Sequence, residues 1–213
     1  TTYPEGQSET FEVENNPVHP EQGSHMITFS REAWIEADDF MEIPIPKYKR
    51  LTPNGPECRL KGAYLITCTG CKKDENGNVV EVYATYDPDS RGGDPADGRK
   101  VKGATIHWVD AANCVEAEVR EYDNLFSDAQ PDAAEDFLTC LNPDSLHVLT
   151  GCKVESSLVE EAKKFDAVEN RAGKNAPAFQ FMRLGYFCLD NQDCHADHLV
   201  FNRSVGLKDS FKK

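Results

Sequence analysis

The sequence predicts a mainly β protein, and three observations support this prediction. Short apolar and aromatic runs recur at close spacing between residues 26 and 205, as in sandwiches and barrels. Turn residues separate these runs, most clearly in the stretch that contains Asn76-Gly77. Helical patterns are confined to the neighbourhoods of residues 132–140 and 158–165. We therefore expect strands joined by regular turns, with a few short helices.

The first third of the chain begins with a polar segment and continues with strand patterns. Residues 1–25 are rich in Glu, Asn and Pro, and we expect them to form an extended entry segment. Strand-like runs follow at Met26–Phe29 and Ala33–Ile35. A longer run, Arg59–Thr69, alternates apolar with polar residues, and we interpret it as one strand.

The middle of the chain predicts a hairpin and two further strands. Lys72–Asn78 contains the Asn-Gly pair that accepts a positive φ at low cost, so it predicts a hairpin turn. Its partner strand is Val79–Tyr86, and a loop rich in Pro, Gly and Asp follows at Asp87–Asp97. Further strands are expected at Val101–Val109 and Val115–Tyr122. The second of these alternates apolar with charged residues, which is typical of a strand with one buried face.

The last third mixes the two short helices with strands. Pro131 precedes a helix candidate at Asp132–Cys140, and Asn142–Leu146 predicts a turn. Ser156 and Ser157, followed by Glu160, resemble a capping box before a helix over Leu158–Phe165. After a loop, the remaining strand patterns are Ala178–Leu189 and Leu199–Val205.

The charge distribution separates an acidic body from one basic segment. The formal net charge is −14, which disfavours binding of nucleic acid over most of the surface. Between residues 47 and 61, however, one acid, Glu57, faces five cations: Lys47, Lys49, Arg50, Arg59 and Lys61. No apolar run approaches the length of a membrane span, and residues 1–10 are polar rather than signal-like. We expect a soluble cytoplasmic protein without a membrane partner.

The eight cysteines leave two possibilities open. Their irregular spacing and the missing secretion signal favour reduced thiols over disulfides. A structural zinc site is the alternative, with candidate ligands Cys68, Cys71, Cys188, Cys194, His195 and His198. Against zinc, Cys68 falls at an apolar position of a predicted strand, and no second CxxC motif is present. We expect no metal site.

Eight segments, in order, resemble one family. They are FSREAWIE at 29–36, YKRL at 48–51, RLKGAY at 59–64, GRKVKGATIHWV at 98–109, EVREYDNLF at 118–126, LNPDSL at 141–146, FQFMRLGYF at 179–187 and FNRSVGL at 201–207. Together they resemble the C-terminal anticodon-binding region of bacterial glutaminyl-tRNA synthetases, which are class I enzymes. No HIGH-like, KMSKS-like, Rossmann or P-loop motif is present, so the resemblance does not extend to a catalytic domain.

The resemblance implies a fold and a function. The fold would be two packed β-barrels, of the kind also seen in ribosomal L25-like proteins, over residues 26–112 and 113–207, with possible strand exchange and a tail at 208–213. The chain would recognise the anticodon loop of tRNA(Gln) as a monomer, beside the catalytic domain of the same protein. The parent ligase would use ATP with Mg, whereas this region would need no cofactor and be inactive alone.

The resemblance also assigns anticodon contacts. Through YKRL and RLK they fall on the five cations of residues 47–61, and Gln180 matches the glutamine that reads the central base. An amide offers a donor and an acceptor, which suits a uracil edge. Replacing Arg59 or Gln180 with Ala is expected to cost about 1–3 kcal/mol of binding.

Three departures from the family pattern affect this assignment. Lys61 stands where Arg is common, which favours phosphate neutralisation over bidentate reading. Lys47 replaces an uncharged polar residue. A further arginine that the family places on the central base would lie upstream of Thr1, so we expect weak RNA binding.

Other cations and other functions remain as alternatives. We expect Arg99, Lys100 and Lys102 to pair with the neighbouring Asp-rich loop rather than with RNA, and His107 to be packed rather than catalytic. A glutamyl-tRNA synthetase of archaeal or eukaryotic type is the nearest alternative family. A standalone L25-like rRNA-binding protein and a zinc-clipped interaction domain are the others.

Overall fold

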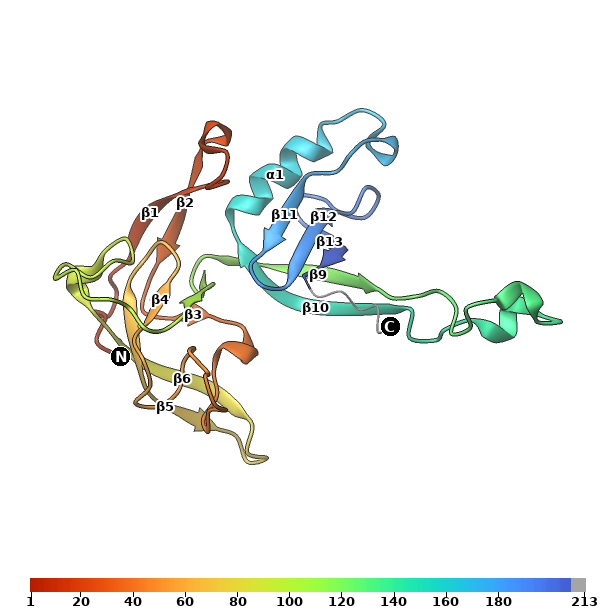
Figure 1. Cartoon of the computed structure of the whole chain (residues 1–213). Helices are drawn as coiled ribbons and strands as arrows, with labels where there is room; N and C mark the ends of the chain where they lie inside the picture. Colours follow the sequence, from red (N-terminus) through yellow and green to blue (C-terminus); the bar gives the residue numbers. More distant parts are fainter. Residues whose placement is uncertain (208–213) are drawn as a thin grey trace. The chain divides into compact units, whose positions relative to one another are not determined.

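The computed structural model describes residues 1–207, and the expected tail at 208–213 lies outside the described part. The chain divides into two compact units, Thr1–Cys114 and Val115–Lys213 (Figure 1). Strands dominate both units and one α-helix is described, so the mainly β prediction is confirmed. No helix within residues 1–207 combines the length and the apolar character needed to cross a membrane.

The first unit contains three sheets. A four-stranded sheet has the order β6-β5-β4-β7, and two-stranded sheets pair β1 with β2 and β3 with β8. Strands β4 and β7 run parallel, whereas the other pairs are antiparallel. The bounds are β1 Glu9–Glu14, β2 Ser24–Phe29, β3 Ala33–Trp34, β4 Cys58–Leu60, β5 Leu65–Lys73, β6 Val79–Tyr86, β7 Thr105–Ile106 and β8 Val109–Asp110.

The second unit is one five-stranded sheet with a helix. The strand order is β10-β9-β13-β12-β11, with β13 parallel to β9. The bounds are β9 Cys114–Tyr122, β10 Leu146–Glu155, α1 Ser157–Asp166, β11 Ala178–Phe181, β12 Gly185–Leu189 and β13 Leu199–Gly206. None of the sheets formed by residues 1–207 closes on itself. The edge strands are β6 and β7 in the four-stranded sheet and β10 and β11 in the five-stranded sheet. The expected pair of closed β-barrels is therefore not confirmed.

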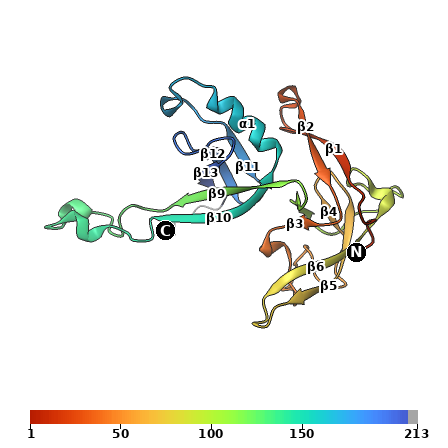
Figure 2. The same ribbon diagram turned by 180° about the vertical axis from the view of Figure 1, so that it is seen from behind.

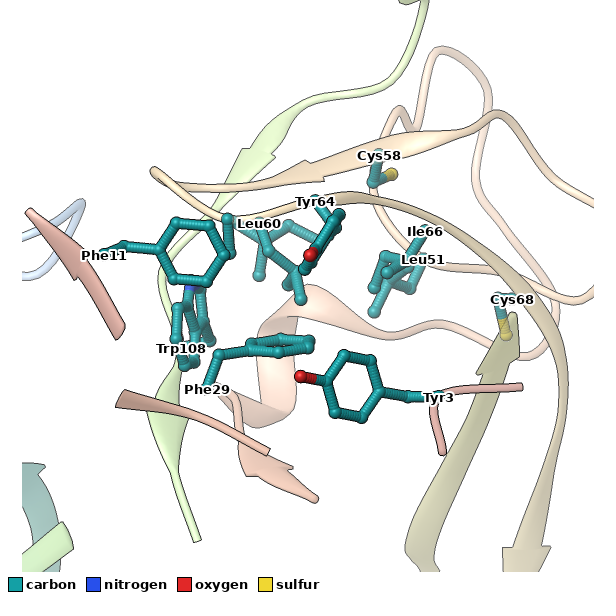
Figure 3. Close-up of a cluster of buried hydrophobic side chains, with 12 residues drawn as sticks. Tyr3, Phe11, Phe29, Leu51, Cys58, Leu60, Tyr64, Ile66, Cys68 and Trp108 are labelled. Carbon is teal, nitrogen blue, oxygen red and sulfur yellow. The ribbon is translucent and has the colours of Figure 1, made fainter. Parts of the chain in front are cut away.

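Each unit has its own apolar core. In the first, an aromatic cluster packs Tyr3, Phe29 and Tyr64 together, with Phe29 edge-on to Trp108 at 5.1 Å between ring centroids (Figure 3). In the second, Phe165 of α1 packs with Phe187 and other side chains of the sheet. Edge-to-face aromatic pairs add to the free energy of burial. The aromatic cluster thus joins the N-terminal segment, β2, the turn between β4 and β5, and the residue before β8.

A partly buried acid, Glu9, fixes the N-terminal strand to this core. The Glu9 carboxylate accepts hydrogen bonds from the hydroxyls of Tyr3 at 2.8 Å and Tyr64 at 2.6 Å, and from Arg91 Nε at 3.1 Å. Burial alone would raise the pKa of Glu9, but these hydrogen bonds outweigh it and lower the pKa below its usual range. Burial and the neighbouring carboxylate raise the pKa of Tyr64 to about 12. The cluster therefore requires an ionised Glu9.

Two predicted strands are each split by a tight turn. The prediction of one strand over Arg59–Thr69 is wrong, because Ala63 N donates to Leu60 O at 3.0 Å and Gly62 has φ 73°. A side chain at position 62 would also meet the neighbouring β1 strand. The prediction of one strand over Ala178–Leu189 is wrong in the same way, since Leu184 N donates to Phe181 O at 2.9 Å. Both segments are hairpins.

Other local predictions have mixed outcomes. The hairpin turn at Lys72–Asn78 is confirmed, with Gly77 at φ 85°. The helix near Leu158–Phe165 is confirmed as α1, but Ser156 makes no capping hydrogen bond, so the capping box is wrong. In place of the helix over Asp132–Cys140 there are two 3-10 turns, Pro131–Ala133 and Phe137–Cys140. Strands β1 and β10 were not predicted, and Val101–Val109 is extended only as the short β7 and the start of β8.

Candidate nucleic-acid interface

The cations Lys47, Lys49 and Arg50 lie on a loop, residues 41–50, whose two ends are fastened together. Leu51 N donates to Asp39 O at 3.0 Å, and Met41 N donates to Leu51 O at 3.0 Å. Leu51 is buried in the core of the first unit (Figure 3). The core thus holds the base of the loop, while its tip extends into solvent.

Side chains alternate along the second half of this loop. Tyr48 Oη and Arg50 Nη1 both donate to the carbonyl oxygen of Asp38, each at 3.0 Å, so they turn back toward the base. Lys47 and Lys49 are exposed, and neither makes a side-chain hydrogen bond or ion pair within residues 1–207. Lys47 follows Pro46 with φ 69°, a conformation that a lysine adopts at a cost. The loop therefore presents two unneutralised cations in a fixed conformation.

Arg59 is tied to the loop that follows β6. Its Nη2 donates to Asp94 Oδ1 at 2.8 Å, its Nη1 lies 3.5 Å from Thr105 Oγ1, and its Nε donates to Gly93 O. Its side chain is 29% exposed, whereas that of Asp94 is 87% exposed. The guanidinium is reachable but is occupied by this loop in the free protein.

Lys61 stands at the turn after β4 and is exposed. Its backbone N donates to Ile106 O at 3.0 Å, and its carbonyl accepts from the Trp108 indole at 3.0 Å. Its ammonium group has no hydrogen bond or ion pair among the described residues. The backbone of Lys61 is thus anchored on both sides while the charge stays available.

The two basic segments meet through Ala104. Ala104 N donates to Lys49 O at 2.7 Å, and Arg59 N donates to Ala104 O at 3.0 Å. The connecting turn closes with Gly55 N donating to Thr52 O at 2.9 Å, and a Cβ at position 55 would lie 2.2 Å from Thr52 Cγ2. Glycine is therefore required there, and Ala104 brings the backbone of Lys49 beside that of Arg59.

The three cations of segment 98–109 differ in whether they form ion pairs. Arg99 forms ion pairs with Glu57 at 2.8 Å, Asp87 at 2.6 Å and Asp97 at 2.9 Å, so its structural role is confirmed. Its hydrogen bond lowers the pKa of Asp87. The same prediction is wrong for Lys100 and Lys102, which are exposed and have no ion pair within the described part of the chain. Lys100 and Lys102 therefore add two positive charges, unpaired among residues 1–207, to the segment that leads to Ala104, the residue that bonds to Lys49 and Arg59.

Gln180 lies in the second unit. It is exposed on β11, between Phe179 and Phe181, which pack against the core. Three residues later Arg183 occupies the β11–β12 turn with φ 67°. No prediction from the sequence included Arg183. Its left-handed conformation beside a predicted contact makes it a further candidate, because such conformations concentrate at functional sites.

The remaining candidates belong to the framework. All eight cysteines are free; Cys68 is buried in the first core and Cys194 in the second. Within residues 1–207, no three His, Cys, Asp or Glu side chains gather in a way that could hold a metal ion. His107 is half-buried between β7 and β8. These observations leave the basic surface of the first unit and the β11–β12 turn of the second as the candidate sites.

Comparison with known proteins extends over the whole chain. The chain is 48% identical over 211 residues to the glutamine–tRNA ligase of Colwellia psychrerythraea, covering 99% of this chain and 35% of that protein. It is 47% identical over 213 residues to the glutamine–tRNA ligase of Clostridioides difficile, covering 100% and 36% respectively. It thus spans about a third of the length of these relatives.

Two family models match successive parts of the sequence. Both are described as the anticodon-binding domain of class I tRNA synthetases (E and Q), and they match residues 1–87 and 105–190. The first match lies within the first compact unit, and the second lies in the second unit except for its first ten residues. The chain therefore belongs to the anticodon-binding domains of the class I tRNA synthetases for glutamate and glutamine.

Proposed function

We propose that the chain is the anticodon-recognition part of a glutamine–tRNA ligase and that it binds the anticodon loop of tRNA(Gln). The observation that carries this proposal is the set of exposed, unneutralised lysines around Ala104, on a chain of net charge −14. Lys47, Lys49 and Lys61 keep their charges without a partner among the described residues. Cations concentrated on one surface of an acidic protein direct RNA to that surface.

The cations would divide into two groups by their surroundings. Lys47, Lys49 and Lys61 neutralise phosphates, and Lys100 and Lys102 extend the same surface. Arg50 Nη1 donates to the Asp38 carbonyl and lies 3.5 Å from the buried carboxylate of Asp39, so it serves RNA binding only if a phosphate or base edge replaces the Asp38 contact. Arg59 likewise exchanges Asp94 for RNA. A guanidinium suits base edges better than an ammonium does, so the arginines would contact base edges while the lysines neutralise phosphates.

Gln180 and Arg183 would read the central base. The amide of Gln180 is exposed at the end of β11 and offers both a donor and an acceptor. Arg183, on the adjoining turn, is partly exposed and would add a planar donor through the part of its guanidinium that is not buried. The names of the relatives favour glutamine over glutamate as the amino acid of the parent enzyme. A glutamyl enzyme remains the second candidate within the same family, and the L25-like alternative has no comparable support.

The parent protein would supply the chemistry. The ligase reaction, with ATP and Mg, would take place outside this chain, whose candidate residues bind RNA. Figure 2 shows a long connection between β9 and β10 that extends away from the sheet. Its side chains Leu125, Phe137 and Leu138 are each more than half exposed, which supports contact with the rest of that protein. We infer a cytoplasmic monomer. Hydrogen–deuterium exchange that is equal at residues 122–149 in this chain and in a full-length relative would contradict the contact.

Titration of a fluorescent anticodon stem-loop tests the RNA-binding proposal. Gln180→Ala is expected to cost about 1–3 kcal/mol of binding, the usual cost of one lost base contact. Gln130→Ala, which removes another exposed glutamine of the same unit, is the matched control and should bind normally. Equal affinity of both variants and the unmodified chain would remove Gln180 from the site. No binding by the unmodified chain at millimolar concentration would reject the function.

A further inference from the structure

Two isoleucines protrude from the basic loop. The side chains of Ile43 and Ile45 are 83% and 61% exposed, and neither belongs to the core of the first unit. Exposed apolar side chains are common singly, but two at alternate positions beside a candidate binding site call for an explanation.

The backbone that carries them is unusually restricted. Each isoleucine precedes a proline, Pro44 or Pro46, which fixes its own φ and confines the residue before it to extended conformations. Tyr48 N donates to Ile45 O at 3.1 Å and closes the turn at Pro46-Lys47. The ends of the loop are fastened at Leu51, as described above. Little conformational entropy would be lost when a ligand met these side chains.

The two isoleucines suit a flat apolar group. Ile43 lies at a bend and Ile45 directly before the Pro46-Lys47 turn, so their exposed side chains come from one short segment of the loop. Isoleucine is among the aliphatic residues that nucleic-acid-binding proteins insert as wedges between bases. In a single-stranded loop the bases are already free to unstack.

The charges of the same loop favour RNA over protein as the ligand. The next two outward positions carry Lys47 and Lys49, with no ion pair among the described residues. A protein surface covering the isoleucines would have to remove these ammonium groups from water or supply acids for both. A single RNA strand offers base planes and phosphates side by side along its backbone.

We propose that Ile43 and Ile45 form an apolar wedge that packs against an unstacked base of the bound RNA loop, while Lys47 and Lys49 hold the phosphates that follow. This inference rests on the proposed function and adds two residues that would determine how the loop is bound. Its ligand class is a single-stranded RNA loop with at least one base turned out of the stack.

The test uses the double variant Ile43→Thr/Ile45→Thr, which keeps the β-branched shape and removes the apolar surface. Binding of the 213-residue chain to an anticodon stem-loop is measured at several salt concentrations. Loss of two buried apolar contacts is expected to weaken binding about tenfold or more. The loss should be the same at every salt concentration, because no phosphate contact is removed. Val18→Thr, at an 80% exposed apolar position of the same unit, is the matched control and should bind normally.

A 2-aminopurine base in the RNA loop reports the packing directly. The unmodified chain should change its fluorescence, and the double variant should reduce that change even at saturating protein. Normal affinity and a normal fluorescence change in the double variant would overturn the wedge. They would mean that the isoleucines face another part of the parent protein. No binding by the unmodified chain would instead reject the proposed function, and the wedge with it.

Discussion

The ion pair between Arg59 and Asp94 predicts a substitution that strengthens RNA binding, whereas most substitutions at a binding site weaken it. Arg59 is reachable by a ligand, but its Nη2 already binds Asp94 at 2.8 Å. RNA must displace this carboxylate before Arg59 can serve a phosphate or a base. Asp94→Asn weakens the competing contact and removes a negative charge beside the site, so it should strengthen RNA binding.

The size of the gain follows from the exposure of the pair. Asp94 is 87% exposed and Arg59 29% exposed, so solvent screens most of their attraction. Exposed pairs of this kind contribute about 0.2–1 kcal/mol. Releasing that amount raises the binding constant by about 1.4- to 5-fold at 25 °C. The free energy of unfolding should fall by no more than about 1 kcal/mol, because the hydrogen bond from Arg59 to Gly93 remains.

Fluorescence anisotropy with an anticodon stem-loop at low salt measures the gain. Asp97→Asn is the matched control, since it removes one charge from the same loop but leaves Arg59 in place. The difference between the two variants isolates the release of Arg59 from the general loss of negative charge. Weaker or unchanged binding by Asp94→Asn relative to Asp97→Asn would refute the exchange at Arg59.

Two further predictions concern the lysines of the 98–109 segment and the partly buried Glu9. Lys100→Ala/Lys102→Ala should reduce the slope of log binding constant against log salt by about 1.4, since each phosphate contact of a single strand contributes about 0.7. Lys72→Ala, which removes a lysine already paired with Glu81, should leave the slope unchanged. Equal slopes for the unmodified chain, the double variant and Lys72→Ala would mean that Lys100 and Lys102 do not contact phosphates. Folding lowers the pKa of Glu9 below 4.5, the ordinary value of a glutamate. The ionised Glu9 therefore stabilises the folded protein above pH 4.5, and this stabilisation is lost as the pH falls through the pKa of Glu9 in the folded state. Urea unfolding between pH 6 and pH 3 should therefore show a flatter decline for Glu9→Gln, and parallel curves would contradict the role given to this acid.

Local patterns predicted the elements whose signals are local. The alternation of Val115, Ala117 and Val119 correctly indicated the buried face of β9. The Asn76-Gly77 pair correctly indicated the β5–β6 hairpin. In contrast, β10 has six consecutive exposed residues at its start, so it shows no alternation and was missed. The turn at Gly62 was missed because a single glycine within an apolar run resembles an interruption in one strand.

The site was predicted at the level of segments and less well at the level of single side chains. Clustering of like charges indicated the basic surface, and the structure brings Lys49 and Arg59 together through Ala104. The partner of Arg59 lies 35 residues away on a loop whose path depends on the whole unit. The path of this loop also determines that Arg99 forms ion pairs whereas Lys102 forms none among residues 1–207. Such long-range choices have no local signature in the sequence.

Competition between two RNA loops tests the central claim most directly. The unmodified chain is titrated with the anticodon stem-loop of tRNA(Gln) and with the same stem-loop changed only at the central anticodon base. Recognition of the anticodon predicts at least about fivefold tighter binding of the unchanged loop, the lower limit for one discriminated base. Equal binding of the two loops, with the same salt dependence, would mean that the chain holds RNA by charge alone and would contradict the account.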